Sequence, residues 1–234
     1  ALTSIVEDLT SDTTIASSNR GTEVSVLSPA SAISDVDGAS VTSMVITYVD
    51  NTNGIWQYNL SRYDNSNWRN ISDTTGAGVD ISATALLIAG AQTGAAANHL
   101  RFVPNANWHG TASIKFRAWD RSALGDGSRT DASINGSTTS ISAEEETATI
   151  TVISVNDPPT GAITGISTIT EDTTTVMSPR FTVADVEDAD ITLTFTTSAG
   201  TFSGVPDGAA YGVVETVVDT DEIKYVGSAA DLNS

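Results

Sequence analysis

The stretch ATITVISVNDPP at residues 148–159 decides how this chain is organised. Apolar residues occupy every second position at its start, and this period of two is typical of a strand with one buried face. The two prolines that follow remove two backbone donors, so no strand can continue through them. The segment therefore predicts a strand that closes one domain and an extended, fairly stiff linker to the next, with domains at 1–157 and 158–234.

The same alternation recurs along the chain between clusters of turn-forming residues. The other expected strands lie at residues 41–49, 56–60, 68–71, 100–102, 114–118, 191–195 and 223–226. Many short strands separated by turn signals predict an all-β fold built from β-sandwiches. Only residues 81–91, where Ala, Leu and Ile fall together, suggest a short helix.

The charge balance narrows the range of partners and cofactors. The chain has 29 acidic and 10 basic residues, a net charge of −19, which disfavours binding to nucleic acid or anionic lipid. Some of the acids are candidate ligands for calcium, which would relieve their repulsion, although a solvated acidic surface explains the same composition. Cysteine is absent, which excludes disulfides and thiolate metal sites. No window approaches the roughly 18 apolar residues of a membrane span, so we expect no membrane insertion.

Two short motifs occur twice. Residues 7–10 (EDLT) correspond to 171–174 (EDTT), and residues 33–38 (ISDVDG) correspond to 183–188 (VADVED). The first repeat continues with FVPNANWHG at residues 102–110 and two further strands, which the second repeat does not match. The second sandwich is therefore expected to be incomplete, either because a repeat is cut or because an inserted domain splits it.

These motifs, together with the segment that ends at Trp119-Asp120 and the linker, resemble the cadherin-like tandem repeats of large RTX-type bacterial surface adhesins. The resemblance implies tandem immunoglobulin-like or cadherin-like β-sandwiches joined by calcium. It implies an extracellular location on the bacterial cell surface and a non-catalytic role as an extender or scaffold that supports cell adhesion or biofilm formation. The implied partners are neighbouring repeats of the same polypeptide, and host or microbial surface glycans or proteins bound through an adjacent domain.

The resemblance also implies a set of calcium ligands around the linker. Carried over to this chain, the set contains Glu7, Asp120, Asn156, Asp157, Asp185, Glu187 and Asp188. Calcium takes six to eight oxygen ligands, which suits carboxylates and amides. The competing interpretation is that these Asp and Asn residues only form turns.

Two other functions remain open at this stage. The aromatic residues Trp56, Tyr58 and Trp68 could stack on a sugar or contact a peptide, although an alternating aromatic hairpin more often packs on its own sandwich. An accessory domain of a secreted hydrolase is the third hypothesis, since carboxylate pairs cannot be excluded by counting. The chain has only two histidines and none of the common catalytic motifs, so we expect no enzyme.

Overall fold

The chain divides into two compact units, Ala1–Val155 and Asn156–Ser234, and the division lies two residues before the expected boundary. The computed structural model describes residues 2–7, 19–27, 43–60, 67–90, 98–122, 124–164, 171–173, 180–187, 190–201, 214–219 and 221–233. The described part is mostly strand with few helical residues, which confirms the predicted all-β class. Among these residues, no helix is long and apolar enough to cross a membrane.

The described residues of unit 1 form two sheets. Its elements are β1 (Ile5–Val6), β2 (Thr22–Glu23), α1 (Val24–Leu27), β3 (Ser43–Asn51), β4 (Gly54–Asn59), β5 (Arg69–Asn70), β6 (Gly76–Asp80), the 3-10 helix η1 (Ser82–Thr84), β7 (Ala85–Ile88), β8 (His99–Pro104), β9 (Gly110–Trp119), β10 (Arg129–Thr130) and β11 (Ile141–Ile153). One sheet has the order β1-β11-β9-β3-β7-β10, with β6 also paired to β3. The other has the order β2-β8-β4-β5.

Both sheets contribute to the main core of unit 1. Along the end of β11, Ala148, Ile150 and Val152 are buried while the residues between them are exposed, as the alternation predicted. They join Trp56 from β4 and Phe102 from β8, whose ring centroids lie 5.2 Å apart. The core therefore ties strands that are distant in the sequence to one another.

The expected helix at residues 81–91 is wrong. Among residues 81–90, which the structure describes, only Ser82–Thr84 are helical, as one 3-10 turn, and Ala85–Ile88 form the strand β7. All four residues of β7 are buried, because the strand pairs with β3 and with β10 and carries apolar side chains on both faces. A short apolar run that is buried on both faces has no alternation, so its period cannot distinguish a strand from a helix.

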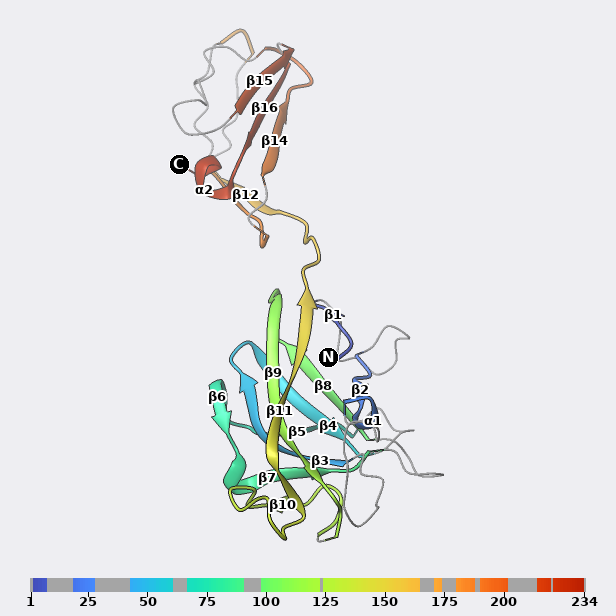
Figure 1. Cartoon of the computed structure of the whole chain (residues 1–234). Helices are drawn as coiled ribbons and strands as arrows, with labels where there is room; N and C mark the ends of the chain where they lie inside the picture. Colours follow the sequence, from blue (N-terminus) through green and yellow to red (C-terminus); the bar gives the residue numbers. More distant parts are fainter. Residues whose placement is uncertain are drawn as a thin grey trace. The chain divides into compact units, whose positions relative to one another are not determined.

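The first and last strands of unit 1 lie side by side. β1 pairs in parallel with β11 at Ile5↔Val152 and Val6↔Ile153, and β11 then leads into the linker (Figure 1). The start of β9 lies on the other side of β11, since Gly110 pairs with Val152. The end of β1, the end of β11 and the turn before β9 are thus brought together.

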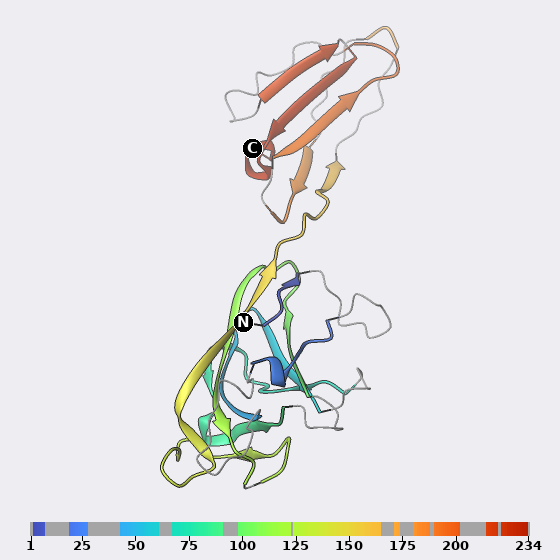
Figure 2. The ribbon, with the colours of Figure 1, turned by 45° about the vertical axis from the view of Figure 1, so that its right-hand side comes forward.

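Unit 2 is smaller, and its described residues form two separate sheets. Its elements are β12 (Thr160–Thr164), β13 (Arg180–Ala184), β14 (Ile191–Thr196), β15 (Val214–Asp219), β16 (Glu222–Gly227) and α2 (Ala229–Leu232). β12 pairs with β13, and the second sheet has the order β14-β16-β15 (Figure 2). Its described residues include four buried apolar side chains, Val183, Ile191, Ile223 and Leu232. Three of them, Val183, Ile191 and Leu232, pack together in one cluster.

The short helix α2 is tied to β13. Its N-cap Ser228 accepts a hydrogen bond from the backbone N–H of Asp231. Just after the helix, the Asn233 side chain accepts a bond from the Val183 N–H and donates one to the Val183 carbonyl, both at 2.8 Å. One amide side chain therefore satisfies the two backbone groups that a neighbouring strand would otherwise bind.

Candidate functional site

Three of the expected calcium ligands gather at the start of unit 2. The backbone N–H of Asp157, in the linker, donates to Glu187 Oε2 at 3.0 Å. The N–H of Glu187 donates to Asp185 Oδ1, also at 3.0 Å, which makes a tight turn directly after β13. Two motifs that lie about 30 residues apart in the sequence are thus in direct contact.

The second carboxylate oxygen of Glu187 is the feature that the turn alone does not explain. Glu187 Oε1 is buried and has no hydrogen-bond partner among the described residues. A buried charged oxygen without a donor is costly, and a bound cation would compensate it. The described part of the chain nevertheless contains no group of three or more His, Asp or Glu side chains already arranged around a metal position.

Of the other two expected ligands here, Asn156 is exposed and its side chain donates to the carbonyl of Asp157 at 3.0 Å. Asp188 lies outside the described residues.

Glu7 is buried at the linker end of unit 1. Its side chain is 0% exposed, its Oε1 accepts a hydrogen bond from the Val155 N–H at 2.7 Å, and its own N–H donates to the Ile153 carbonyl. Its Oε2 has no hydrogen-bond partner in the described part of the chain and lies 3.6 Å from Nδ1 of His109. The carboxylate thus connects the end of β1, through a hydrogen bond, to Val155, the residue that begins the linker.

Asp120 does not belong with Glu7. β9 begins beside the end of β11 at Gly110↔Val152 and ends at Trp119↔Ile141, so Asp120 lies at the opposite end of the strand. Nine strand steps of about 3.3 Å separate the two ends by about 30 Å, which no single ion can bridge. Asp120 instead accepts a hydrogen bond from the Ser122 N–H at 2.8 Å and shapes a turn.

Two of the three candidate aromatic residues, Trp56 and Tyr58, belong to the core of unit 1. Trp56 is 0% exposed and Tyr58 is 6% exposed, so neither can stack on a sugar in the folded chain. Trp68 is partly buried, and the guanidinium of Arg101 lies 4.1 Å from its ring centroid. The interpretation that this hairpin packs on its own domain therefore fits the structure for Trp56 and Tyr58.

Arg101 is a buried cation on the outer side of the β2-β8-β4-β5 sheet. Its Nε donates to Gln57 Oε1 at 2.8 Å and its Nη1 to the Asn19 carbonyl at 3.1 Å. It forms no ion pair with a described residue, and burial lowers its pKa to about 10. Neutral acceptors and the Trp68 ring hold this side chain, an arrangement that suits a structural role.

The pairing of His109 with Glu7 is not predicted by the sequence. The two residues are 102 positions apart, and nothing in their spacing links them. They meet only because β1 and β9 flank the same end of β11. The one available signal is that His109 belongs to the FVPNANWHG motif, which precedes two further expected strands of the first repeat.

No family model, no curated protein and no solved structure matches this chain.

Proposed function

We propose that this chain is a non-catalytic, calcium-stiffened extender segment of a bacterial surface adhesin, exposed outside the cell, which supports cell adhesion or biofilm formation. In this proposal both units are cadherin-like β-sandwiches, and neighbouring repeats of the same polypeptide are the main partners. The proposal rests on the motif resemblance and on the behaviour of the acidic residues near the linker.

The observation that carries the proposal is the contact between Asp157, Asp185 and Glu187. They come from the linker and from the Asp-rich motif, the two segments for which the resemblance implies calcium ligands, and hydrogen bonds bring them together. Glu187 has a buried oxygen without a donor among the described residues, which fits a cation, and all the groups present are hard oxygen ligands of the kind that calcium prefers. Glu7 is a further buried carboxylate of the same kind in unit 1.

A calcium titration of the full chain tests this assignment. Calorimetric titration should give binding in the wild-type protein and a much weaker signal in Glu187→Gln and Asp185→Asn, which keep side-chain size and remove charge. Thermal unfolding should be stabilised by about 2.7 kcal/mol when free calcium is 100-fold above its dissociation constant.

Asp131→Asn is the matched control. Asp131 also shapes a turn, by accepting a hydrogen bond from the Ser133 N–H at 2.9 Å. It lies in unit 1, whereas Asp185 and Glu187 lie in unit 2. This variant should bind calcium as the wild type does. Equal loss in Asp131→Asn and Glu187→Gln would show that general acidity binds the ion. Identical unfolding in calcium and in chelator would reject the calcium assignment.

The proposed stiffening of the chain by calcium is measured separately from calcium binding. Backbone ¹⁵N relaxation should report one tumbling time for both units in calcium and two different times after chelation. Independent tumbling in both conditions would contradict the extender role while leaving calcium binding intact.

A further inference from the structure

Among the described residues, the strand β12 of unit 2 has an open edge. All five of its residues are exposed, and in the described part of the chain it pairs only with β13. Both backbone groups of Val183 are bound by Asn233, so Val183 and its cross-strand partner Gly161 direct their N–H and C=O groups away from each other. By alternation Ile163 does the same, so Gly161 and Ile163 offer two donors and two acceptors at the free edge.

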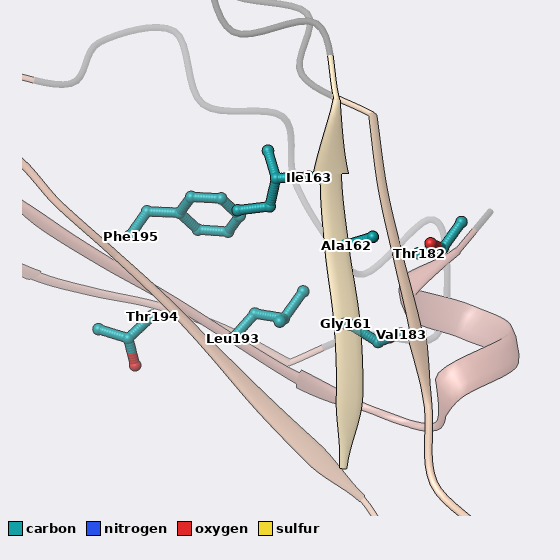
Figure 3. Close-up of a pocket in the computed structure, with 8 residues that line it drawn as sticks. All are labelled: Gly161, Ala162, Ile163, Thr182, Val183, Leu193, Thr194 and Phe195. Atoms are coloured by element: carbon teal, nitrogen blue, oxygen red, sulfur yellow. The ribbon is translucent and has the colours of Figure 1, made fainter.

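An apolar groove follows this edge. It has a volume of about 250 Å³ and is lined by β12 together with Val183, Leu193 and Phe195. Ile163 is 56% exposed, and its side chain points across the groove toward Phe195 (Figure 3). An unpaired edge beside an exposed apolar groove is suited to receiving an added strand.

We propose that the added strand is β12 of a second copy of this chain, paired antiparallel about a two-fold axis at Ala162. In that register Gly161 of each copy faces Ile163 of the other. A pair of this type exchanges both of its N–H···O=C bonds, so the free groups of each copy are satisfied by the same groups of its partner.

Side-chain size fits the same register. Directly opposed residues of an antiparallel pair lie on the same face of the sheet, so Ile163 of the second copy lies next to Gly161. Gly161 has no side chain, and a Cβ built there would meet its nearest neighbours, the Thr182 carbonyl oxygen and Val183 Cγ1, at 3.5 Å. The glycine therefore leaves room for the incoming isoleucine beside Val183 and Leu193, which line the groove.

Charge limits the strength of this association. Each copy carries a net charge of −19, which opposes pairing, but residues 158–170 contain no charged side chain. Repulsion therefore comes from the rest of the chain and weakens as salt screens it. Two five-residue strands also bury far less than the roughly 1,200 Å² of a stable complex, so the dimer is weak and depends on concentration and salt.

Sedimentation equilibrium and amide exchange of the full chain test the proposal. A monomer–dimer equilibrium should shift toward dimer as protein and salt concentrations rise, both in calcium and in chelator. In the dimer the amides of Gly161 and Ile163 should gain protection, whereas the amide of Ala162, already directed at β13, should change little.

Two variants and one control complete the experiment. Ile163→Lys places a charge at the edge, and Gly161→Val fills the space opposite Ile163; each should weaken the dimer by at least about tenfold. Thr192→Lys adds the same charge on the exposed face of β14 and should leave the dimer unchanged. A chain that stays monomeric at every concentration overturns the proposal. So does protection of Gly161 and Ile163 in the monomer, which would mean that the same chain closes its own edge.

Discussion

The two units use similar strands but bury them to very different extents. Unit 1 packs Trp56, Phe102 and Ile114 at 0% exposure into one core that includes both sheets. Unit 2 has four buried apolar side chains among its described residues, and its strand β12 is exposed along its whole length. Because apolar burial is the main source of stability, strand pairing alone does not make the units equivalent.

The two units therefore depend on different interactions for their ordered structure. In unit 1 a broad core fixes the strand register, since a one-residue slip would turn each buried side chain to the outside. In unit 2 local hydrogen bonds, such as those of Asn233 with Val183, contribute a larger share. Unit 1 should therefore respond strongly to changes in packing, and unit 2 to changes in its edges and ligands.

A matched pair of core truncations gives the largest expected effect. Ile114→Ala in unit 1 should cost about 4 kcal/mol and Ile191→Ala in unit 2 about 2 kcal/mol, because a loosely packed site collapses more easily around the lost volume. All four tryptophans precede residue 120, so tryptophan fluorescence follows unit 1 alone, while calorimetry follows both transitions. Equal costs for the two changes would contradict the contrast between the cores.

Hydrogen exchange compares the units without mutation. Amides in the β9–β11 pairing should exchange at least about tenfold more slowly than those in the β12–β13 pairing, because the smaller unit opens more easily. Mass spectrometry of peptides from the two pairings measures this directly. Strong and equal protection in both would show that unit 2 is complete as it stands.

Glu7→Gln examines the buried carboxylate of unit 1. The amide keeps an acceptor for the Val155 N–H but removes a buried charge whose second oxygen lacks a donor in the described part of the chain. In chelator the variant should be as stable as the wild type, or more stable by up to about 1 kcal/mol. In calcium the order should reverse if Glu7 is a ligand. Tryptophan fluorescence during thermal unfolding measures the stability of the wild type and the variant in each condition. If the order of the two stabilities is the same in calcium as in chelator, Glu7 is not a calcium ligand.

Asp80 provides the smallest expected effect. The Ser82 N–H donates to Asp80 Oδ1 at 2.8 Å, and this backbone bond, with that of the Ser82 side chain, lowers the pKa of Asp80 below 3.8. A lowered folded-state pKa stabilises the fold above the ordinary value, and this contribution is lost as pH falls through the folded-state value. Compared with Asp80→Asn, which cannot titrate, the wild type should lose under about 1 kcal/mol on acidification below about pH 4, since the group is exposed.

The sequence predicts the structure well where adjacent residues determine it, through alternation or through proline. It predicts the structure less well where pairing between distant strands determines it. The strand before the linker and the division near Val155 follow from a few adjacent residues. The direction of β9 depends instead on its pairing with β11. This pairing puts Asp120 at the end of unit 1 that lies away from Glu7. Trp56 and Trp68 looked alike in the sequence, and only the packing of two sheets separates a buried ring from one stacked on Arg101.

The parallel pairing of β1 with β11 has a mechanical consequence. Tension applied between the start of β1 and the linker pulls two parallel strands in opposite directions along their length. The bonds between them, including Leu2 N–H to the Thr149 carbonyl and Glu7 N–H to the Ile153 carbonyl, are then loaded in shear and must break together. An antiparallel closing pair pulled at one end would instead unzip bond by bond at lower force. Unit 1 is therefore built to resist stretching along its own chain.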